Sequence, residues 1–308
     1  MGSPPFGVEV LRQLLGSSHE IAAVVTPPDR PRGRGRRTRT SPLAELAEEW
    51  HEPIQLLRPV TTRDESFSAT LAALQPDALM VASYGEILRQ PVLDLAPLGA
   101  FNVHASLLPR WRGAAPIQHA LLAGDAETGV SVQRMVLALD AGDLILSSKT
   151  PIESEESAGE LLARLAVLGG QVAVQALDLL EAGGVSFTPQ DPAEITLAPK
   201  LKKEDGALDW SESAESIVRK IRAFTPWPGV HTTLPNGRRL GIRRARVNPE
   251  ASGSPGSVLA DQEGFCVACG GGAALSLLEV QPEGKGPMDG EAFVRGARLD
   301  PDCHLGAA

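Results

Sequence analysis

Short apolar runs alternate with helical patterns between residues 8 and 180, and this alternation constrains the fold more than any other feature. Parallel strands need a crossover connection, usually a helix, and they are buried on both faces. Near-continuous apolar runs separated by helices therefore predict an α/β fold with a doubly wound, mostly parallel sheet. The predicted strands are 21–25, 54–57, 78–82, 100–103, 130–136 and 144–147, and the predicted helices are 8–15, 42–50, 64–74, 117–123 and 157–180.

The start of the chain departs from this alternation. Met1 is followed by a turn-like Gly-Ser-Pro-Pro-Phe segment and then by the first helical pattern, so no strand comes first. In alternating β/α chains a glycine-containing turn into the first helix normally follows a central strand. Either the fold begins with a helix, or a first strand is absent from this sequence.

Beyond residue 206 the pattern changes to short strands separated by turn signals. We predict a helix at 214–223, a hairpin turn at Asn236-Gly237, and strands at 231–234, 240–247, 256–260, 265–268 and 274–280. Such strands favour a small β-barrel of the oligonucleotide-binding (OB-like) kind. Proline and charged residues between the two patterns are typical of a linker. The predicted domains are an α/β domain at 1–187, a linker at 188–206 and a β-barrel domain at 207–308.

Composition excludes several classes of protein. With 308 residues, 43% hydrophobic and 22% charged, the chain is an ordinary globular protein. No apolar run approaches the roughly 18 residues that span a bilayer, so we expect no membrane segment. Three cysteines are too few for a disulfide framework and favour a cytoplasmic protein. Cys266, Cys269, Cys303 and His304 offer zinc ligands, but no second Cys-x-x-Cys pair supports a site, so we expect no metal.

The net charge of −9 conceals two basic segments. Residues 27–39 carry six arginines against one aspartate, and their prolines and glycines predict an irregular, exposed loop. Arginines spaced by glycine can fork onto phosphates, whereas the plainer alternative is a solvated surface loop. The candidate nucleic-acid contacts are Arg32, Arg34, Arg36 and Arg37. Residues 219–246, here called the C-terminal basic cluster, hold eight lysines and arginines and no acidic residue, which favours a polyanion partner.

Polar residues with catalytic potential stand at the end of the predicted strand 100–103. Asn102 and His104 are two residues apart, so they project from one face of the strand at its carboxyl end. Asp140 lies in a Leu-Asp-Ala-Gly-Asp turn, a pattern that is also common in purely structural turns. An amide can stabilise an oxyanion, an imidazole can carry a proton, and a carboxylate can orient the imidazole and accept a proton from an amine. These types fit acyl transfer to an amine, whereas the plainer alternative is that Asn102 and His104 only end the strand.

The residues around this site resemble a known family. The stretch from Asn102 to Ile117 reads N-V-H-A-S-L-L-P-R-W-R-G-A-A-P-I, and Leu139 to Asp143 reads L-D-A-G-D. Both are similar to motifs of the folate-dependent formyltransferases, and most closely to those of the methionyl-tRNA formyltransferase family. The resemblance extends to the P-P-D-R-P-R-G-R-G-R loop, to K-L-K-K-E-D-G-A-L-D-W in the predicted linker, and to R-A-F-T-P-W-P-G at the start of the second domain.

This resemblance implies a Rossmann-like catalytic domain, with Asn102, His104 and Asp140 as catalytic residues. It also implies that Ser106, Leu107, Leu108 and Pro109 line a tetrahydrofolate pocket, and that Arg34 inserts against the acceptor end of a tRNA. Lys200, Lys202 and Lys203 are the tRNA contacts that it implies in the linker. The formyl donor would be 10-formyltetrahydrofolate, the acceptor would be initiator methionyl-tRNA, and the protein would be a monomer. The family has a strand before the position of Gly2, which this sequence lacks.

Three alternatives remain open at this point. A formyltransferase for an amino-sugar nucleotide and a formyltetrahydrofolate hydrolase would share Asn102, His104 and Asp140. The arginine-rich loop and the C-terminal basic cluster argue against both, because small acceptors need no polyanion-binding track. An RNA-binding module with an inert first domain is the third alternative, and the intact set of three residues argues against it.

Overall fold

The computed structural model describes residues 1–2, 5–32, 37–259, 264–297, 299 and 303–306. Side chains of 30–32 and 37–39 also lie outside this description. The chain forms two compact units. Unit 1 comprises Met1–Pro116, Glu127–Pro151 and Leu162–Ala198, and unit 2 comprises Ile117–Ala126, Ile152–Leu161 and Pro199–Ala308. The predicted linker 188–206 is therefore divided between the two units after residue 198.

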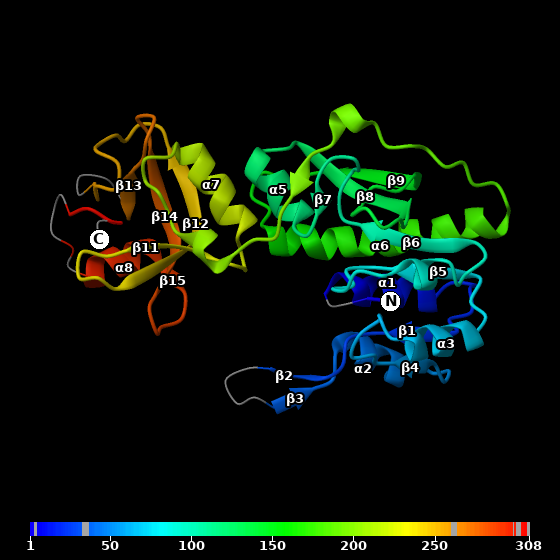
Figure 1. Ribbon diagram of the computed structural model, residues 1–308. Coiled ribbons are helices and arrows are strands. Elements are labelled where there is room, and N and C mark those ends of the chain that lie inside the picture. Colours follow the sequence, from blue (N-terminus) through cyan, green and yellow to red (C-terminus); the bar gives the residue numbers. More distant parts are fainter. Residues whose placement is uncertain (3–4, 33–36, 260–263, 298, 300–302, 307–308) are drawn as a thin grey trace. The chain divides into compact units, whose positions relative to one another are not determined.

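The elements up to residue 198 alternate as the sequence predicts (Figure 1). The helices are α1 (Phe6–Leu15), α2 (Pro42–Glu49), α3 (Glu65–Ala73), α4 (Gln90–Leu93), α5 (Pro116–Ala123) and α6 (Ala158–Glu181). The strands are β1 (Ala23–Val25), β2 (Arg30–Arg32), β3 (Arg37–Arg39), β4 (Gln55–Leu57), β5 (Ala78–Val81), β6 (Gly99–His104), β7 (Arg112–Gly113), β8 (Glu127–Arg134), β9 (Leu144–Pro151) and β10 (Leu197–Ala198).

The central sheet of unit 1 is parallel at one end and antiparallel at the other. β1 pairs with β4 and β5 pairs with β6 in parallel, whereas β8 and β9 continue the sheet from β6 in antiparallel order. Between β1 and β5 the only link in the described chain is the first dipeptide, since Gly2 N donates to Val25 O and Gly2 pairs in parallel with Ala82. The predicted doubly wound α/β fold is confirmed.

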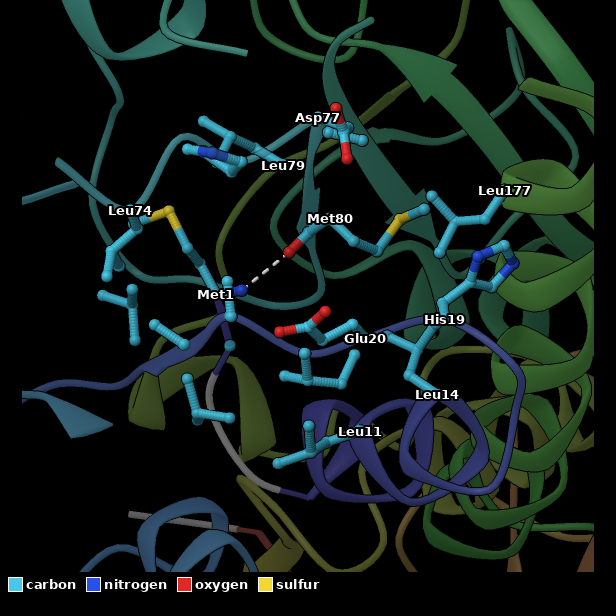
Figure 2. Close-up of a pocket in the computed structure, with 18 of the residues that line it drawn as sticks. Met1, Leu11, Leu14, His19, Glu20, Leu74, Asp77, Leu79, Met80 and Leu177 are labelled. Carbon is cyan, nitrogen blue, oxygen red and sulfur yellow. Dashed lines mark hydrogen bonds between the residues drawn. The ribbon is translucent and has the colours of Figure 1, made fainter. Parts of the chain in front are cut away.

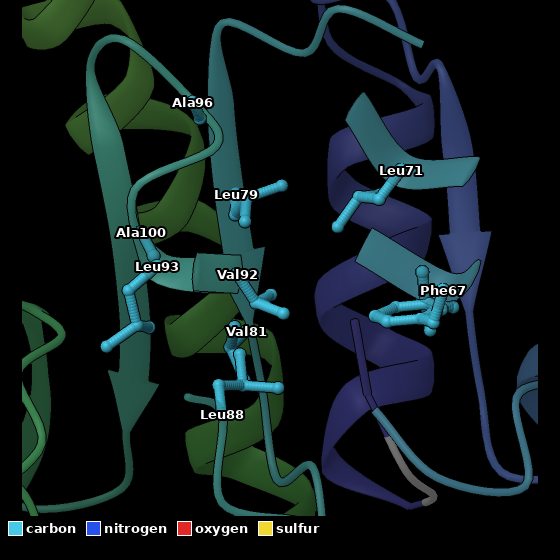
Figure 3. Packing of buried hydrophobic residues seen from close by; sticks show 10 residues of the cluster. Phe67, Leu71, Leu79, Val81, Leu88, Val92, Leu93, Ala96 and Ala100 are labelled. Atoms are coloured by element: carbon cyan, nitrogen blue, oxygen red, sulfur yellow. The ribbon is translucent and has the colours of Figure 1, made fainter. Parts of the chain in front are cut away.

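Helices cover both faces of this sheet, and consecutive residues of β1 face opposite sides. Val24 packs in an apolar cluster with Leu11 of α1. Its neighbour Val25 packs on the other face with Phe67 of α3 and Leu79 of β5 (Figure 3). A strand with apolar residues at successive positions is thus buried on both sides, which is the arrangement that the continuous apolar runs predict.

Helix α6 is long and apolar enough, by length and composition alone, to cross a bilayer, although charged residues such as Arg164 and Asp178 interrupt its apolar run. Its contacts are those of a core helix. A Cβ atom at Gly169 would stand 2.8 Å from the ring of Phe6 in α1 and 3.3 Å from Val103 in β6. The missing side chain therefore lets α1 and β6 approach α6 closely.

The arginine-rich segment is more regular than predicted. Its ends form β2 and β3, an antiparallel pair in which Arg30 stands opposite Arg39 and Arg32 opposite Arg37. The prediction of a wholly irregular loop is therefore wrong at both ends. Pro31 is accommodated because a two-stranded ribbon has open edges, where no ladder hydrogen bond is lost to the missing N–H.

Unit 2 is built on a curled antiparallel sheet with strand order β11-β12-β14-β13, and the predicted OB-like β fold is confirmed. Its strands are β11 (Val230–Thr233), β12 (Arg239–Asn248), β13 (Cys266–Ala268), β14 (Ala274–Pro282) and β15 (Met288–Asp289), and its later helices are α7 (Ala214–Ala223) and α8 (Gly290–Ala297). The strand predicted at 256–260 appears only as isolated bridges from Ser257 to His304 and from Val258 to Val267, and residue 260 lies outside the described residues.

Candidate active site

Strand β6 delivers two polar side chains at its carboxyl end. Phe101 and Val103 point into the core with at most 2% exposure. Because side chains alternate along a strand, Asn102 and His104 share the other face. His104 is buried, with 6% of its surface exposed, and Asn102 is half-buried. The apolar run thus anchors the strand and presents both predicted residues together.

The turn between β8 and β9 brings Asp140 to this pair. Asn102 Nδ2 donates to Asp140 Oδ1 at 3.3 Å, and His104 Nδ1 lies 3.7 Å from Asp140 Oδ2. Two further donors hold the carboxylate, the Gly113 backbone N–H to Oδ2 at 2.9 Å and Gln133 Nε2 to Oδ1 at 2.9 Å. The three residues that the sequence singled out therefore converge. Three N–H donors around one carboxylate suit a group that only accepts hydrogen bonds, which is its ionised form.

The hydrogen bonds of His104 define which ring nitrogen carries the hydrogen. Its Nε2 lies 2.9 Å from the carbonyl oxygen of Trp111, which can only accept, so Nε2 is the donor. In the neutral ring Nδ1 is then an acceptor that faces Asp140. Trp111 is itself fixed by its backbone N–H, which donates to Thr196 Oγ1 at 2.9 Å. The imidazole is oriented so that a proton gained at Nδ1 would lie beside the carboxylate.

Two residues of the site have a left-handed backbone that favours glycine. Trp111 has φ +68° and Asp140 has φ +49°. For a residue with a side chain this conformation costs roughly 1–2 kcal/mol. The backbone carbonyl of the first and the carboxylate of the second both contact His104, so the strained conformations coincide with the contacts that orient the imidazole.

Gln190 is the centre of a hydrogen-bond network behind Asp140. Its Nε2 lies 2.9 Å from the carbonyl oxygen of Asp140, 2.7 Å from that of Gly142, and 3.2 Å from Gln133 Oε1. Its Oε1 accepts from Arg112 Nε at 3.0 Å and from the Arg112 terminal nitrogen at 2.8 Å. One amide side chain therefore joins the β8–β9 turn to the residues that follow the site loop.

Sequence analysis missed both glutamines. Gln133 stands directly opposite Asn102 in the β6–β8 ladder and is 2% exposed, so a glutamine inside the apolar run 130–136 was a usable signal. Gln190 lies in the predicted linker, where no periodic pattern marks it. Thr188, two residues earlier, exchanges backbone hydrogen bonds with Leu144 at 2.8 and 2.9 Å, which explains why the start of this segment is fixed on unit 1.

The predicted folate-contacting residues form the loop that follows β6. They are Ser106, Leu107, Leu108 and Pro109. Ser106 is fully buried, and its hydroxyl donates to the Arg110 carbonyl at 2.7 Å, while its own carbonyl accepts from Ser131 Oγ. The Leu108 N–H donates to the same Ser131 Oγ at 3.1 Å. The side chains of Ser106 and Ser131 therefore fix the loop's shape beside the site.

The predicted tRNA contacts are placed only in part. Arg34 and Arg36 lie outside the described residues, and the backbones of Arg32 and Arg37 form the β2–β3 pair. Lys200, Lys202 and Lys203 are exposed at the start of the long final segment of unit 2.

The C-terminal basic cluster is partly structural. An Arg239 terminal nitrogen lies 2.8 Å from His231 Nδ1, and burial, together with this guanidinium, lowers the pKa of His231 from its ordinary value. Arg243 donates to a glutamine side chain at 2.8 Å. By contrast, Arg244 and Arg246 are exposed on the same face of β12, on either side of the buried Ala245. These two remain available to a polyanion.

The cysteines give no metal site among the described residues, where no group of three or more His, Cys, Asp or Glu side chains lies close enough to hold an ion. Cys266 and Cys269 are buried in and just after β13, and burial raises the pKa of the Cys269 thiol to about 12. Such a thiol stays protonated at neutral pH.

Residues 1–177 match the family described as formyl transferase, and residues 200–298 match the C-terminal domain of the formyl transferases. The chain belongs to the formyl transferase family. A protein of Ectopseudomonas mendocina named methionyl-tRNA formyltransferase is 49% identical to this formyltransferase over 288 residues, which cover 93% of this chain and 90% of that protein.

Solved structures share the fold of this formyltransferase. The sugar 3N-formyl transferase WlaRD, solved with dTDP and 5-N-formyl-THF, superposes with a TM-score of 0.66 at 16% identity and covers 92% of this chain and 97% of that one. HypX from Aquifex aeolicus, in complex with tetrahydrofolic acid, gives a TM-score of 0.60 at 21% identity and covers 83% of this chain and 45% of that one. At these identities the likeness concerns the fold alone.

Proposed function

We propose that this enzyme transfers the formyl group of 10-formyltetrahydrofolate to the α-amino group of methionine on initiator methionyl-tRNA, giving N-formylmethionyl-tRNA for translation initiation. The observation that carries the chemistry is the convergence of Asn102, His104 and Asp140 at the end of β6, with contacts of 3.3 and 3.7 Å to the carboxylate. The acceptor follows from the relative that is 49% identical over most of both chains and is named for it. The folate donor is supported by the complex of its structural neighbour HypX with tetrahydrofolic acid.

Each side chain has a role in the proposed reaction. The amine attacks the formyl carbon, the C–N bond forms, and the carbonyl oxygen becomes an oxyanion that the Asn102 amide stabilises. The attacking nitrogen loses a proton to Asp140. Asp140 passes this proton to Nδ1 of the neutral His104, and the resulting imidazolium gives a proton to the departing folate nitrogen as its C–N bond breaks. No covalent intermediate is required.

Basic residues supply the proposed tRNA-binding surface. The exposed Lys200, Lys202 and Lys203 belong to it, as do Arg244 and Arg246 of β12. The arginine-rich loop adds Arg32, Arg34, Arg36 and Arg37. Phosphate contacts of this kind position a nucleic acid without reading its sequence. We propose that the enzyme acts in the cytoplasm as a monomer and needs no metal or membrane.

A formyl-transfer assay tests the function. Labelled 10-formyltetrahydrofolate is supplied with methionyl-initiator tRNA, with uncharged tRNA, with an amino-sugar nucleotide, or with no acceptor. Label is expected only on methionyl-initiator tRNA. Label on the sugar nucleotide would make the enzyme a sugar formyltransferase, and free formate without an acceptor would make it a hydrolase. If the protein binds tRNA tightly but transfers no label, it is an RNA-binding protein without transferase activity.

Gln190→Ala is expected to lower kcat by about 10- to 100-fold, because unpaired buried polar groups cost roughly 1–3 kcal/mol and the Asp140 turn loses its support. KM for methionyl-tRNA should change little, since Gln190 reaches the site only through other residues. Steady-state kinetics measure both constants, and Gln55→Ala on the exposed surface of β4 is the control. If Gln190→Ala lowers the melting temperature but leaves kcat unchanged, Gln190 stabilises the fold and does not position Asp140 for catalysis.

Arg34→Ala is expected to reduce discrimination between initiator and elongator methionyl-tRNA, with folate binding unaffected. The prediction takes Arg34 to contact base edges as well as phosphates, and the loss of one base-directed arginine is worth about 1–3 kcal/mol, or roughly 5- to 150-fold in the ratio of kcat/KM values. The control is Arg63→Ala, an exposed arginine outside the loop. Equal losses on both tRNAs would show that the arginine contributes charge but no selectivity.

A further inference from the structure

The segment 196–198, which the sequence places in a linker, pairs with the loop that follows the candidate catalytic strand. β10 runs parallel to β7, with Ala198 opposite Gly113. One residue before β10, Thr196 is hydrogen-bonded to Trp111. Both strands and all three candidate catalytic residues belong to unit 1. The last residues of the predicted linker in unit 1 are therefore part of the surroundings of the site.

The loop that β10 pairs with supplies a backbone group to each of the two side chains proposed to carry protons. The carbonyl oxygen of Trp111 accepts from His104 Nε2 at 2.9 Å. Two residues later, the backbone N–H of Gly113 donates to Asp140 Oδ2 at 2.9 Å. A displacement of this short stretch would disturb both contacts, so whatever fixes the stretch also orients the imidazole and the carboxylate.

Thr196 holds the Trp111 end of this stretch. Its Oγ1 accepts from the Trp111 N–H at 2.9 Å, and its backbone carbonyl accepts from the Arg112 N–H at 2.9 Å. Its own N–H donates to the carbonyl of Pro109 at 3.4 Å. Trp111 has φ +68°, a left-handed conformation that residues with a side chain rarely adopt. The threonine hydroxyl oxygen therefore stabilises a backbone conformation that is unfavourable by itself.

The Gly113 end is held by backbone groups alone. The carbonyl of Ala198 accepts from the N–H groups of Ala114 and Ala115 at 2.9 and 3.2 Å. A Cβ atom at Gly113 would stand 2.5 Å from this carbonyl oxygen, so the close approach of the two strands requires glycine. The hydroxyl of Thr196 can thus be removed by substitution while the backbone pairing of β7 and β10 is kept.

The position of the Trp111 carbonyl decides which nitrogen of the neutral His104 ring carries the hydrogen. A carbonyl oxygen can only accept, so it favours the hydrogen on Nε2 and leaves Nδ1 as an acceptor, 3.7 Å from Asp140 Oδ2. The proposed reaction needs this tautomer, because Asp140 passes its proton to Nδ1. In the opposite tautomer Nδ1 already carries a hydrogen and cannot accept another. An imidazole held in the wrong tautomer loses most of its activity as a proton carrier.

We propose that Thr196 is a positioning residue of this enzyme, whose hydroxyl oxygen holds the backbone of Trp111 so that the Trp111 carbonyl keeps the hydrogen of the neutral His104 ring on Nε2. This inference rests on the proposed formyl transfer, in which the imidazole must accept a proton at Nδ1. Thr196 acts through the backbone of Trp111 and does not act on the reacting atoms. Part of the predicted linker therefore determines the state of the imidazole.

Steady-state kinetics of substitutions at Thr196 in the full chain test this proposal. Thr196→Val removes the acceptor and keeps the branched shape, and it is expected to lower kcat by about 5- to 100-fold, the effect of losing one buried hydrogen bond. KM for methionyl-tRNA should stay within about twofold, because the lost contact orients a group that acts in the chemical step. Thr196→Ala lacks the same acceptor and should behave alike, whereas Thr196→Ser should keep kcat within about threefold of the parent. The control is Thr70→Val, which removes a hydroxyl on the exposed surface of α3.

Nitrogen-15 NMR of the histidine-labelled protein reads the tautomer without any substrate. Spectra are recorded at about pH 8.5, where an ordinary imidazole is neutral. The signals of His104 are assigned by their absence from His104→Gln. The parent and Thr196→Ser are expected to carry the ring hydrogen on Nε2, whereas Thr196→Val and Thr196→Ala are expected to show a mixture with the hydrogen on Nδ1.

The outcomes separate positioning from a purely structural role. A parental tautomer in both Thr196→Val and Thr196→Ala would overturn the proposal, whatever happens to kcat. Equal losses of kcat in Thr196→Val and Thr196→Ser would also overturn it, since the hydroxyl would then not be the group that matters. A parent protein that transfers no formyl group would instead refute the proposed function, and the spectra would still decide whether Thr196 sets the tautomer of His104.

Discussion

Asp140→Asn is expected to slow formyl transfer by about 10²- to 10⁴-fold, while tRNA binding stays within a few-fold of the parent. The carboxylate accepts at both oxygens, from Asn102 and Gln133 at Oδ1 and from the Gly113 N–H at Oδ2. An asparagine offers one acceptor oxygen, so its NH2 must face at least one of these donors. It also cannot take a proton from the attacking amine. Single-turnover transfer and equilibrium tRNA binding measure the two effects separately.

Asp143→Asn is the matched control, because this residue lies in the same turn and contributes only its backbone carbonyl, which accepts from the Arg134 N–H. Its transfer rate should remain within about threefold of the parent, since the half-buried side chain of Asp143 makes no hydrogen bond to Asn102, His104 or Asp140 in the described structure, and a substitution that breaks no such contact costs roughly 0.5 kcal/mol. Near-normal turnover in Asp140→Asn would contradict the proposed role of the carboxylate. A parallel loss of tRNA binding would show instead that the substitution disrupts the fold.

The residues of the candidate site could be predicted where the two-residue repeat of a strand places catalytically capable side chains on one face. Asn102 and His104 follow from two-residue spacing at the end of an apolar run, and Asp140 from its glycine turn. The supports of Asp140 were not predictable in the same way. Gln190 reaches the site from fifty residues along the chain through contacts that exist only once the β8–β9 turn has formed. Long-range polar contacts leave no periodic trace in a sequence.

The fold was predictable where burial enforces a pattern. The strand limits of β5 and β6 agree with the predicted runs to within one residue, because both faces of these strands are covered. The β2–β3 pair was missed, because proline and glycine suppress strand signals while backbone pairing between arginines needs no apolar pattern. The limits of α6 agree with the predicted helix 157–180 to within one residue, although isolated charged residues interrupt its apolar run.

The comparison is between the protein with a free Met1 amine and the same protein acetylated at Met1. Between pH 5 and pH 8 the free energy of unfolding of the unacetylated protein is expected to rise by an amount of the order of 4 kcal/mol relative to that of the acetylated protein. The amine has its ordinary pKa of 8.0 when the chain is unfolded, and burial lowers it to about 5 in the folded protein. In this window the unfolded chain binds one proton more than the folded one, so acidification favours unfolding. Each pKa unit corresponds to about 1.4 kcal/mol.

Urea unfolding at pH 5.5, 6.5, 7.5 and 8.5 would measure this difference, with intact mass verifying that Met1 is present. Histidine titrations contribute alike to both proteins, so they cancel when the two stability curves are subtracted. The acetylated chain keeps an N–H for the carbonyl of Met80 (Figure 2) but has no charge to desolvate. If the free energies of unfolding of the two proteins differ by the same amount at every pH, water reaches the Met1 amine in the folded protein. Stability curves that converge above pH 8 would show that burying the Met1 amine costs stability only where the amine is charged in the unfolded chain.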